Sequence, residues 1–432
     1  MSRKALFAAL AGILATALLA AAAEGGVSGS LAAGTGSSAS AESAVFRVDS
    51  SSLPLGADSS ASPARRPDSA ALAALDAKLS EYLLSLTPQV ERVKEGECDF
   101  LISSCEDSLL RQRIALKAYD FYLTSHLMGD EAVAIHIFDK WFASGRVKML
   151  SDVDFMNAGV FADFNRSSLL GCTAPRLTLQ NMGGGLEQAP RDGKVSLLFF
   201  YDTSCSKCKM ETILSKQLLR SGEYVFDFFA VYTGASRTEW VEFIKSNYGF
   251  ETPGVSVHHL WDPELSSDFQ RLYGVLQTPR IFLVAPDGEI IGRGLDTEAA
   301  IKLLPYATML QALYDRCPVG GRLPDVSVSA RLLKGRSPGK ARVFSLRKFR
   351  GSPGYVFFYS RSCSRCRSQM EKVDSVLSSG RRTRILMVDM DALQRDYPQM
   401  ARECLDSFDL TVLPKVLRVD RRGRVLSRSD SF

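Results

Sequence analysis

The stretch FFYDTSCSKCK at residues 199–209 decides the fold, because a near copy, FFYSRSCSRCR, stands at residues 357–367. Each copy begins with an apolar segment typical of a buried strand, passes into C-x-x-C and continues with helical periodicity. Two cysteines at that spacing between a strand and a helix indicate a dithiol redox site. The repeat therefore predicts a duplicated redox domain within one chain.

Residues 1–23 have the parts of a secretory signal peptide. Arg3 and Lys4 precede an apolar run over residues 5–19, and small residues at 21–23 offer a cleavage site. The run is short for a membrane span, and no cysteine stands near the cleavage site to carry a lipid anchor. We expect the mature chain to be exported and soluble.

Length and charge limit the architecture and the class of partner. The chain has 432 residues, enough for two to three domains, and 46% of them are hydrophobic. Its formal net charge of +5 balances 53 Lys and Arg against 48 Asp and Glu. This near balance argues against nucleic acid or an anionic membrane as the partner.

Two further segments precede the first C-x-x-C. Residues 24–70 are rich in Ser, Ala and Gly and predict a disordered linker. Residues 71–170 predict a helical domain, with helices over 106–128 and 130–142 separated by Gly129. This domain contains no motif with a recognisable chemical role.

The histidines show no metal-binding pattern. His126 and His136 are ten residues apart and lack a second pair of ligands. His258 and His259 are neighbours on an expected strand, where successive side chains point to opposite faces. We therefore expect neither a metal nor a cofactor.

Strands and helices alternate after the first C-x-x-C, which predicts an α/β fold with a sheet covered on both faces. The first redox unit is expected over residues 171–316 and the second over residues 317–432. In the first unit the expected strands are 224–232, 257–261, 280–285 and one ending at Gly292, and the expected helices are 238–247, 264–273 and one starting at Thr297. The second unit has an expected strand over 415–420.

A proline follows each C-x-x-C at the start of a strand, and a turn follows the strand. These are Thr278-Pro279 with Asp287-Gly288, and Leu413-Pro414 with Arg422-Gly423. Over about residues 170–432 this order resembles thioredoxin-fold proteins, specifically the exported TlpA/ResA-like thiol-disulfide oxidoreductases. The resemblance implies two thioredoxin-like domains behind a helical domain, in the periplasm of a Gram-negative bacterium.

The resemblance also implies how substrates bind. Pro279 and Pro414 should be cis and lie against the active-site sulfurs, and the backbone at Thr278 and Leu413 should pair with a substrate strand. The expected partners are protein thiols and disulfides, with a membrane electron donor or acceptor upstream. The oligomeric state and the direction of electron flow stay open.

The C-x-x-C spacing has a physical reason. Two cysteines three residues apart at a helix start lie on one side of the first turn, and the helix N-terminus favours the thiolate of the first. Cys205 and Cys363 are therefore the expected nucleophiles. Cys208 and Cys366 are expected to resolve the mixed disulfide.

Some positions depart from the family pattern. Phe199 and Phe357 stand where related proteins often have a buried acid six residues before the first cysteine. Three residues after the second cysteine, the two copies carry Glu211 and Gln369. The second unit ends at Phe432 without a closing helix, so one face of its sheet should be thinly covered or borrow cover elsewhere.

Five cysteines lie outside the C-x-x-C pairs, and an odd number in an oxidising compartment leaves at least one outside a stable disulfide. They are Cys98, Cys105, Cys172, Cys317 and Cys404. Cys98 and Cys105 flank a short segment and are candidates for a structural disulfide. The other pairings stay open.

Two other functions compete with disulfide exchange. A scaffold whose dithiols are structural or hold Cu(I) is compatible with soft thiolate ligands and with Met210 and Met370 nearby. A peroxiredoxin-type peroxidase is rejected because the complete motif around a lone peroxidatic cysteine is missing. The scaffold remains the alternative to the oxidoreductase.

Overall fold

The computed structural model describes residues 69–432 except 335–336, 380–382, 409, 411–412 and 430. The expected signal peptide, and the expected linker up to residue 68, lie outside the described residues. Ser69 and Ala70, the last two residues of that expected linker, already belong to the first described helix. Within the described residues, no helix is both long enough and apolar enough to cross a membrane.

The chain divides into two compact units after Phe121, and the described part of the first unit is helical. It contains α2 (Ser69–Ser85), α3 (Glu91–Ser103) and most of α4 (Ser108–Leu123). The buried Tyr82 hydroxyl donates to Glu97 Oε2 at 2.7 Å, which joins α2 to α3. The helix expected over 106–128 is shorter in the structure, because α4 ends at Leu123. The helix α3 was not predicted from the sequence.

The second compact unit starts at Tyr122, near the end of α4. Its first complete helical elements are α5 (Asp130–Ile137), a π-helical turn η1 (Phe138–Ala143) and α6 (Asp152–Arg166). Gly129 adopts φ 101° immediately before α5, which explains why a glycine separates the helices. Ser151 caps α6 by accepting from the backbone N–H of Asp154 at 3.1 Å. Sequence reasoning missed α6.

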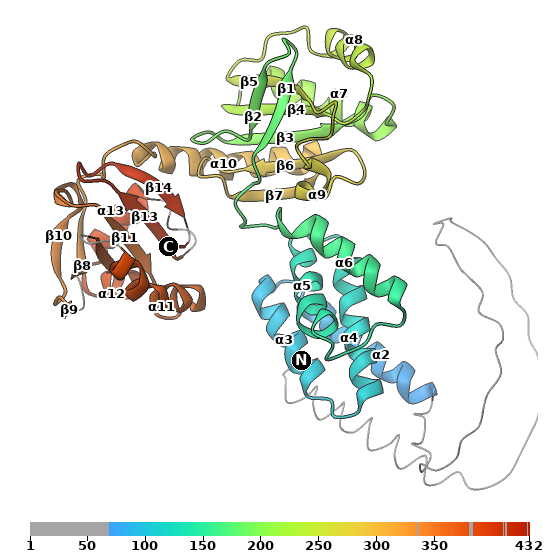
Figure 1. The fold of residues 1–432 in the computed structure, drawn as a ribbon, viewed down its shortest axis with the longest axis horizontal. Coiled ribbons are helices and arrows are strands. Elements are labelled where there is room, and N and C mark those ends of the chain that lie inside the picture. Colours follow the sequence, from blue (N-terminus) through green and yellow to red (C-terminus); the bar gives the residue numbers. More distant parts are fainter. Residues whose placement is uncertain (1–68, 335–336, 380–382, 409, 411–412, 430) are drawn as a thin grey trace, which may run out of the picture. The chain divides into compact units, whose positions relative to one another are not determined.

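The first sheet has seven strands in the order β2-β1-β5-β4-β3-β6-β7 (Figure 1). β3, β4 and β5 are parallel to one another, and the remaining neighbours are antiparallel. The strands are β1 (Leu177–Asn181), β2 (Leu186–Ala189), β3 (Ser196–Tyr201), β4 (Phe226–Tyr232), β5 (Val255–Trp261), β6 (Arg280–Val284) and β7 (Ile290–Leu295). The helices are α7 (Ser206–Ser221), α8 (Arg237–Asn247), α9 (Phe269–Tyr273) and α10 (Thr297–Arg316).

Strand β3 is buried along its whole length because both faces of the sheet are covered. Leu197, Phe199 and Tyr201 pack in a core with side chains of α7, α8 and α10. Leu198 and Phe200 point to the opposite face and pack with side chains of α9. The mixed α/β architecture predicted from the sequence is confirmed.

The predicted helix over 264–273 is wrong in its first half. Leu265 and Asp268 have φ values of 51° and 56°, which a helix does not allow. The buried carboxylate of Asp262 accepts from the backbone N–H groups of Ser266 and Ser267 at 3.0 and 2.8 Å. These bonds hold a loop, so only α9 is helical.

The second sheet has the order β10-β8-β12-β11-β13-β14, and the short β9 pairs with β8. Its strands are β8 (Ser327–Lys334), β9 (Ser337–Pro338), β10 (Arg342–Ser345), β11 (Gly354–Tyr359), β12 (Arg384–Asp389), β13 (Lys415–Val419) and β14 (Val425–Ser429). The helices are the short 3-10 turn η2 (Leu346–Lys348), α11 (Ser364–Ser379), α12 (Met390–Asp396) and α13 (Pro398–Ser407). As in the first sheet, the strand that leads to the C-x-x-C is paired in parallel on one side and antiparallel on the other.

Phe432 helps to cover the face of the second sheet that was expected to be thin. Its ring lies 5.0 Å from that of Phe357 and 5.5 Å from that of Tyr355. Side chains of α11, including Val373, join the same core. A single aromatic residue thus packs where the first sheet has α10.

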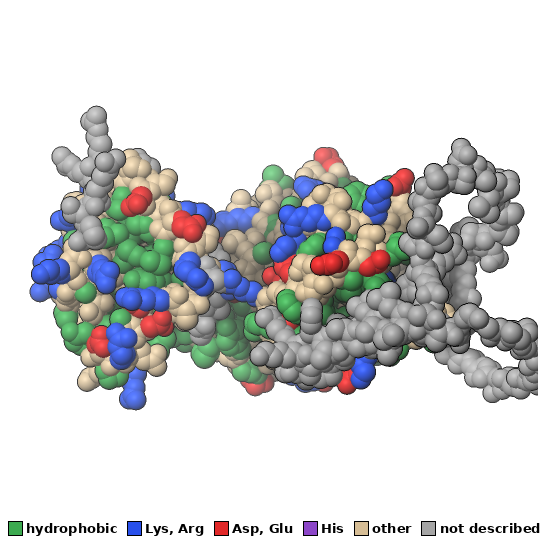
Figure 2. Space-filling model, turned by 90° about the horizontal axis from the view of Figure 1, so that it is seen from below, with side chains coloured by type: hydrophobic (Ala, Val, Ile, Leu, Met, Phe, Trp, Pro, Cys, Tyr) green, Lys and Arg blue, Asp and Glu red, His purple; other side chains and the backbone are tan. Residues whose placement is uncertain are grey.

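Figure 2 shows both basic and acidic side chains on this face, outside its grey atoms. The mixture agrees with the small net charge of the sequence.

Candidate functional site: two strand-to-helix dithiols

The end of β3 places Cys205 at the start of α7. The Asp202 carboxylate accepts from the backbone N–H of Ser204 at 2.8 Å, which fixes the loop between strand and helix. Cys205 is the N-cap residue of α7, and its Sγ accepts from the backbone N–H of Cys208 at 3.1 Å. The first sulfur therefore lies at the positive end of the helix.

The two cysteines of this pair have opposite environments. Cys205 is half-buried, whereas Cys208 is fully buried. Burial tends to raise the pKa of Cys205, but hydrogen bonds from the Cys208 thiol and N–H, and from Thr278, lower it overall. Burial raises the pKa of Cys208 to about 12. The accessible sulfur is thus the one that ionises first.

Thr278 lies directly against the first sulfur. The Cys205 thiol donates to the Thr278 carbonyl oxygen across 3.3 Å. The peptide bond between Thr278 and Pro279 is cis, as the resemblance implied, and β6 starts at the next residue. The structure therefore brings Cys205, Cys208, Thr278 and Pro279 together at one end of the sheet.

The second dithiol repeats this geometry. Cys363 Sγ accepts from the backbone N–H of Cys366 at 3.2 Å, and the Cys363 thiol donates to the Leu413 carbonyl at 3.4 Å. The bond between Leu413 and Pro414 is also cis. Cys366 is fully buried, and burial raises its pKa to about 12.

Different residues hold the loop that precedes each pair, and sequence reasoning missed them. In the second copy the Asp391 carboxylate accepts from the Ser360 hydroxyl at 2.8 Å and from the Arg361 N–H at 2.9 Å. Asp391 lies about thirty residues further on, in the first turn of α12. Only the pairing of β11 with β12 brings it to the loop, so no local signal could identify it.

The position three residues after the second cysteine has a structural role in both copies. Glu211 Oε2 accepts from the backbone N–H of Thr297, the first residue of α10, at 2.8 Å. Gln369 Oε1 accepts from the backbone N–H of Phe432 at 3.1 Å. Each side chain therefore holds the segment that follows the last strand of its sheet.

Phe199 and Phe357, which replace the buried acid of related proteins, are both buried in the cores. Apolar side chains therefore occupy this position in both sheets. A proton relay through it has no group to carry the proton.

The other cysteines have separate environments. Cys317 and Cys404 are fully buried, and burial raises their pKa values to about 11 and about 12. The Cys105 thiol donates to the Asp107 carbonyl at 3.6 Å. Cys98 and Cys105 are not joined in the structure, so a disulfide between them stays a prediction.

We expect Thr278→Val to raise the pKa of Cys205, because it removes a hydroxyl that stabilises the thiolate. Alkylation of Cys205 by iodoacetamide at pH 7 should slow roughly three- to tenfold, since the thiolate is the reactive form. Mass spectrometry across a pH series measures this rate. Thr238→Val, on the exposed first turn of α8, is the matched control. An unchanged pH profile would show that the hydroxyl plays no part.

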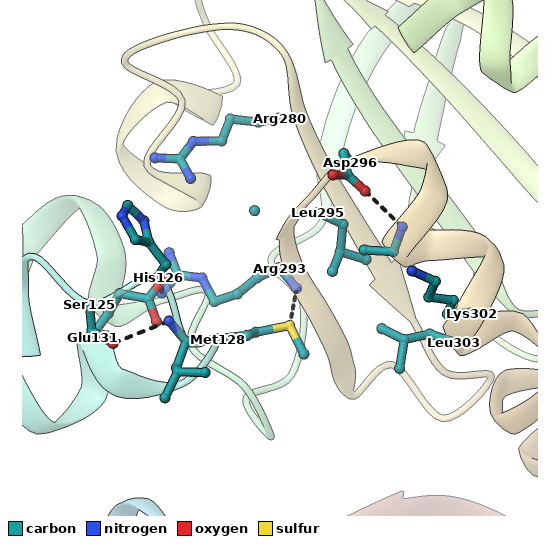
Figure 3. Close-up of a pocket in the computed structure, with 13 residues that line it drawn as sticks. Ser125, His126, Met128, Glu131, Arg280, Arg293, Leu295, Asp296, Lys302 and Leu303 are labelled. Carbon is teal, nitrogen blue, oxygen red and sulfur yellow. Dashed lines mark hydrogen bonds and ion pairs between the residues drawn. The ribbon is translucent and has the colours of Figure 1, made fainter. Parts of the chain in front are cut away.

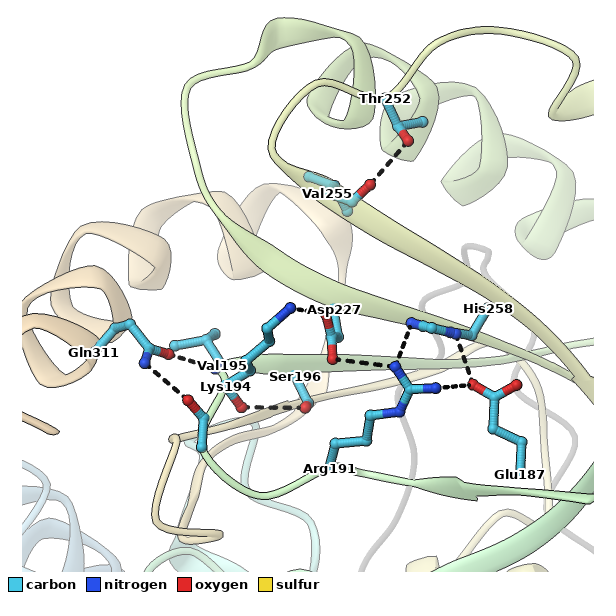
Figure 4. A network of polar contacts seen from close by, with 11 residues as sticks. Glu187, Arg191, Lys194, Val195, Ser196, Asp227, Thr252, Val255, His258 and Gln311 are labelled. Atoms are coloured by element: carbon cyan, nitrogen blue, oxygen red, sulfur yellow. Dashed lines mark hydrogen bonds and ion pairs between the residues drawn. The ribbon is translucent and has the colours of Figure 1, made fainter. Parts of the chain in front are cut away.

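His258 and His259 point to opposite faces of β5, as predicted. His258 Nδ1 lies 2.6 Å from Glu187 Oε1, and Arg191 donates to the same Glu187 carboxylate at 2.7 Å (Figure 4). His259 packs edge-on against the ring of Tyr248, 4.7 Å away. Both side chains therefore pack against other residues of the first domain, one on each face of β5.

We expect acid to destabilise the first sheet through His259. Burial lowers its pKa to about 4, while an unfolded chain keeps a histidine pKa near 6.5. Between these values the unfolded state binds more protons, so stability falls as pH falls. The ring of His259 is half-buried, and solvent therefore weakens the effect. We expect the free energy of unfolding to fall by about 2 kcal/mol by pH 4.

Urea unfolding at pH 7 and pH 4.5 measures this loss. His259→Gln should reduce the difference in the free energy of unfolding between pH 7 and pH 4.5. The exposed His126→Gln should leave this difference unchanged. An equal difference in all three proteins would contradict the assignment to His259.

No family model matches the chain, and no curated protein matches it. Among solved structures, a thioredoxin-like protein from Bacteroides caccae aligns over 54% of this chain and 84% of its own, at 13% identity and a TM-score of 0.43. The thioredoxin domain of a thiol-disulfide oxidoreductase from Bacteroides vulgatus aligns over 31% and 97%, at 22% identity and a TM-score of 0.27. A thiol-disulfide oxidoreductase from Bacteroides fragilis aligns over 31% and 98%, at 22% identity and a TM-score of 0.28.

The fold is thioredoxin-like. This conclusion rests on the two mixed sheets flanked by helices and on the C-x-x-C at the start of α7 and of α11. It also rests on the proline that stands immediately before β6 and before β13.

Proposed function

We propose that the chain is an exported thiol-disulfide oxidoreductase that exchanges disulfides with partner proteins at two C-x-x-C sites. In this proposal residues 1–23 are the signal peptide, 24–70 the linker and 71–170 the helical domain. The two thioredoxin-like domains comprise residues 171–316 and 317–432, and the protein acts in the periplasm of a Gram-negative bacterium.

One observation carries the proposal. Each dithiol pairs a half-buried sulfur, against the carbonyl before a cis proline, with a fully buried second sulfur. Nucleophilic attack needs access and a thiolate, while resolution needs only proximity to the first sulfur. In both copies the geometry provides an accessible first sulfur with the second cysteine close behind it.

The reaction balances over the two thiols of a site. The Cys205 thiolate attacks one sulfur of a partner disulfide, a mixed disulfide forms, and the departing partner thiolate takes up a proton. Cys208 then loses its proton and attacks Cys205, which releases the second partner thiol. The partner gains two electrons, and Cys205–Cys208 becomes the oxidised disulfide. Cys363 and Cys366 act in the same way, and all steps run in reverse when the site oxidises a dithiol.

The carbonyl groups beside the two nucleophiles support a substrate role for the preceding residues. Thr278 and Leu413 present these groups next to the reactive sulfurs, where the backbone of an extended partner segment can pair with them. A polar Thr278 and an apolar Leu413 favour different partner segments. Renewal of either site requires an electron donor or acceptor, which we assign to a membrane protein.

The Cu(I)-binding alternative is weaker on these observations. Both thiols of a site must lose their protons to hold the ion, and Cys208 and Cys366, the second thiol of each site, are fully buried. Met210 is 61% exposed and points away from the core, so nothing in the packing directs it to the dithiol.

Reduction of insulin disulfides in the presence of dithiothreitol tests the proposal. The variants Cys205→Ser and Cys363→Ser should each lose part of the rate, and the double variant should fall to the uncatalysed rate. Cys105→Ser is the matched control because this cysteine lies outside both pairs. Undiminished activity in the double variant would overturn the assigned nucleophiles.

A further inference from the structure

A cavity of about 590 Å³ lies beside the strand that follows Pro279. Its lining includes Arg280, Arg293 and His126, together with apolar side chains such as Met128 and Leu303. Figure 3 shows Arg280, Arg293 and His126 reaching into the same side of the pocket. A volume of this size accommodates one or two side chains of a bound segment.

Arg293 is the buried cation of this pocket. Only 2% of its side chain is exposed, and Nη2 donates to Asn165 Oδ1 at 2.7 Å. Nη1 has no hydrogen-bond acceptor among the described residues, because the nearest carboxylate oxygen, Glu131 Oε1, is 3.8 Å away. A buried guanidinium donor without an acceptor is costly, so an anion that enters the pocket would satisfy it.

Arg280 adds a second positive charge. Burial lowers the pKa of Arg293 overall, against the opposing effect of the Glu131 carboxylate, and the neighbouring charge of Arg280 lowers it as well. A Cβ atom at Gly294 would lie 3.1 Å from Arg280 Nη1, so the absence of a side chain there leaves room for the guanidinium.

The acidic side chains of the lining are already engaged. Asp296 Oδ1 accepts from the backbone N–H of Ala299 at 2.7 Å, as the cap of α10. Glu131 Oε2 accepts from the backbone N–H of Gly129 at 3.0 Å. Glu131 Oε1 also lies 3.8 Å from Arg293 Nη1, so Glu131 compensates part of the positive charge of the two arginines, whereas Asp296 serves the helix cap.

The pocket is close to the reactive sulfur along the chain. Arg280 is two residues from Thr278, a span of at most about 7 Å, and the Thr278 carbonyl contacts Cys205 Sγ. In the second copy, Lys415 holds the place of Arg280, but its Nζ is bound to Asp287 Oδ2 at 3.0 Å and only 5% of its side chain is exposed. The cationic side chain that follows the proline therefore lines a cavity at the first site, whereas at the second site it is buried in an ion pair.

We propose that this pocket binds an acidic side chain, preferably glutamate, of a partner polypeptide whose cysteine reacts at Cys205. The proposal rests on the proposed function of the first dithiol and names its substrate class. The two guanidinium groups bind the carboxylate, and the apolar lining packs against the methylene groups. The first site therefore selects partners that carry an acidic residue near the reactive cysteine.

The test uses the full mature chain with Cys363→Ser and Cys366→Ser, so that only the first dithiol reacts. The probes are two peptides whose single cysteine is blocked as a thionitrobenzoate disulfide. One carries Glu two residues to either side of the cysteine, and the other carries Gln. At low ionic strength the Glu peptide should react about tenfold faster.

Arg280→Gln should reduce the ratio of the two rates to near one. Arg293→Gln should have the same effect. Because Arg293 is buried, this variant could fail to fold, and the Arg280→Gln variant at the half-buried Arg280 then decides the outcome. Arg271→Gln, an exposed residue of α9 outside the pocket lining, should leave the ratio unchanged. Equal rates for both peptides, or a ratio that survives Arg280→Gln, would overturn the proposal.

Failure of the proposed function gives a different result. If neither peptide releases thionitrobenzoate, the first dithiol is not an exchange site. Fluorescence anisotropy with S-methylated versions of the peptides then judges the pocket alone. Tighter binding of the Glu peptide that weakens in Arg280→Gln supports the pocket, and equal binding of both peptides overturns it.

Discussion

The Cys208→Ser variant is expected to accumulate a mixed disulfide between Cys205 and a partner protein. Cys205 keeps its half-buried position and its bond to the backbone N–H of residue 208, so the first attack remains possible. The hydroxyl of the new serine cannot complete the exchange. Resolution loses its intramolecular step and should slow by about 10³-fold or more.

Non-reducing electrophoresis and peptide mapping measure this product after reaction with an oxidised partner. The background should carry Cys363→Ser and Cys366→Ser, so that only the first site reacts. Cys404→Ser is a matched control, because Cys404 is as deeply buried as Cys208 but lies in the core of the second sheet. Equal adduct formation in Cys205→Ser and Cys208→Ser would contradict the order of attack.

Phe200→Ala is expected to destabilise the first sheet by about 3–5 kcal/mol. Phe200 is fully buried, and its ring lies 5.4 to 6.1 Å from the rings of Phe269, Tyr273 and Phe282. Truncation removes these contacts and leaves a cavity between β3 and α9. Because Phe200 lies one residue before Tyr201, where β3 ends, the loop that carries Cys205 depends on this packing.

Tryptophan fluorescence follows this effect during urea unfolding. Two of the three tryptophans, Trp240 and Trp261, belong to the core on the other face of the same sheet. Leu276→Ala is the control, since that side chain is 65% exposed and its truncation should change stability by no more than about 0.5 kcal/mol. A loss below about 1 kcal/mol in Phe200→Ala would contradict the packing described for this face.

The sequence was sufficient for features that depend on short-range patterns. The apolar run before each C-x-x-C predicted β3 and β11, and the proline-led segments predicted β6 and β13, because strand signals and x-Pro steps are local. Thr297 was also placed correctly at the start of α10. The dithiol pairs and the residues before the two prolines are brought together as the family resemblance implied.

Other features depend on contacts between distant residues and left no local signal. The carboxylate of Asp262 binds the backbone after it and holds a loop where a helix was expected. Asp391 contacts a loop about thirty residues earlier, and only the pairing of two strands brings them together. Edge strands such as β2 and β10 are short and mostly exposed or half-buried, so their apolar pattern is weak. Arg293 looked like an ordinary strand residue until the structure placed it in a cavity with Arg280.

The most direct test of the account is a redox titration of the mature protein in glutathione buffers, with each dithiol scored by alkylation and mass spectrometry. The account predicts that Cys205/Cys208 and Cys363/Cys366 both cycle reversibly as two-electron couples. A potential near about −270 mV would identify a reductase, and one near about −120 mV a dithiol oxidant. If neither pair cycles, the oxidoreductase proposal is wrong and the dithiols have a structural or metal-binding role.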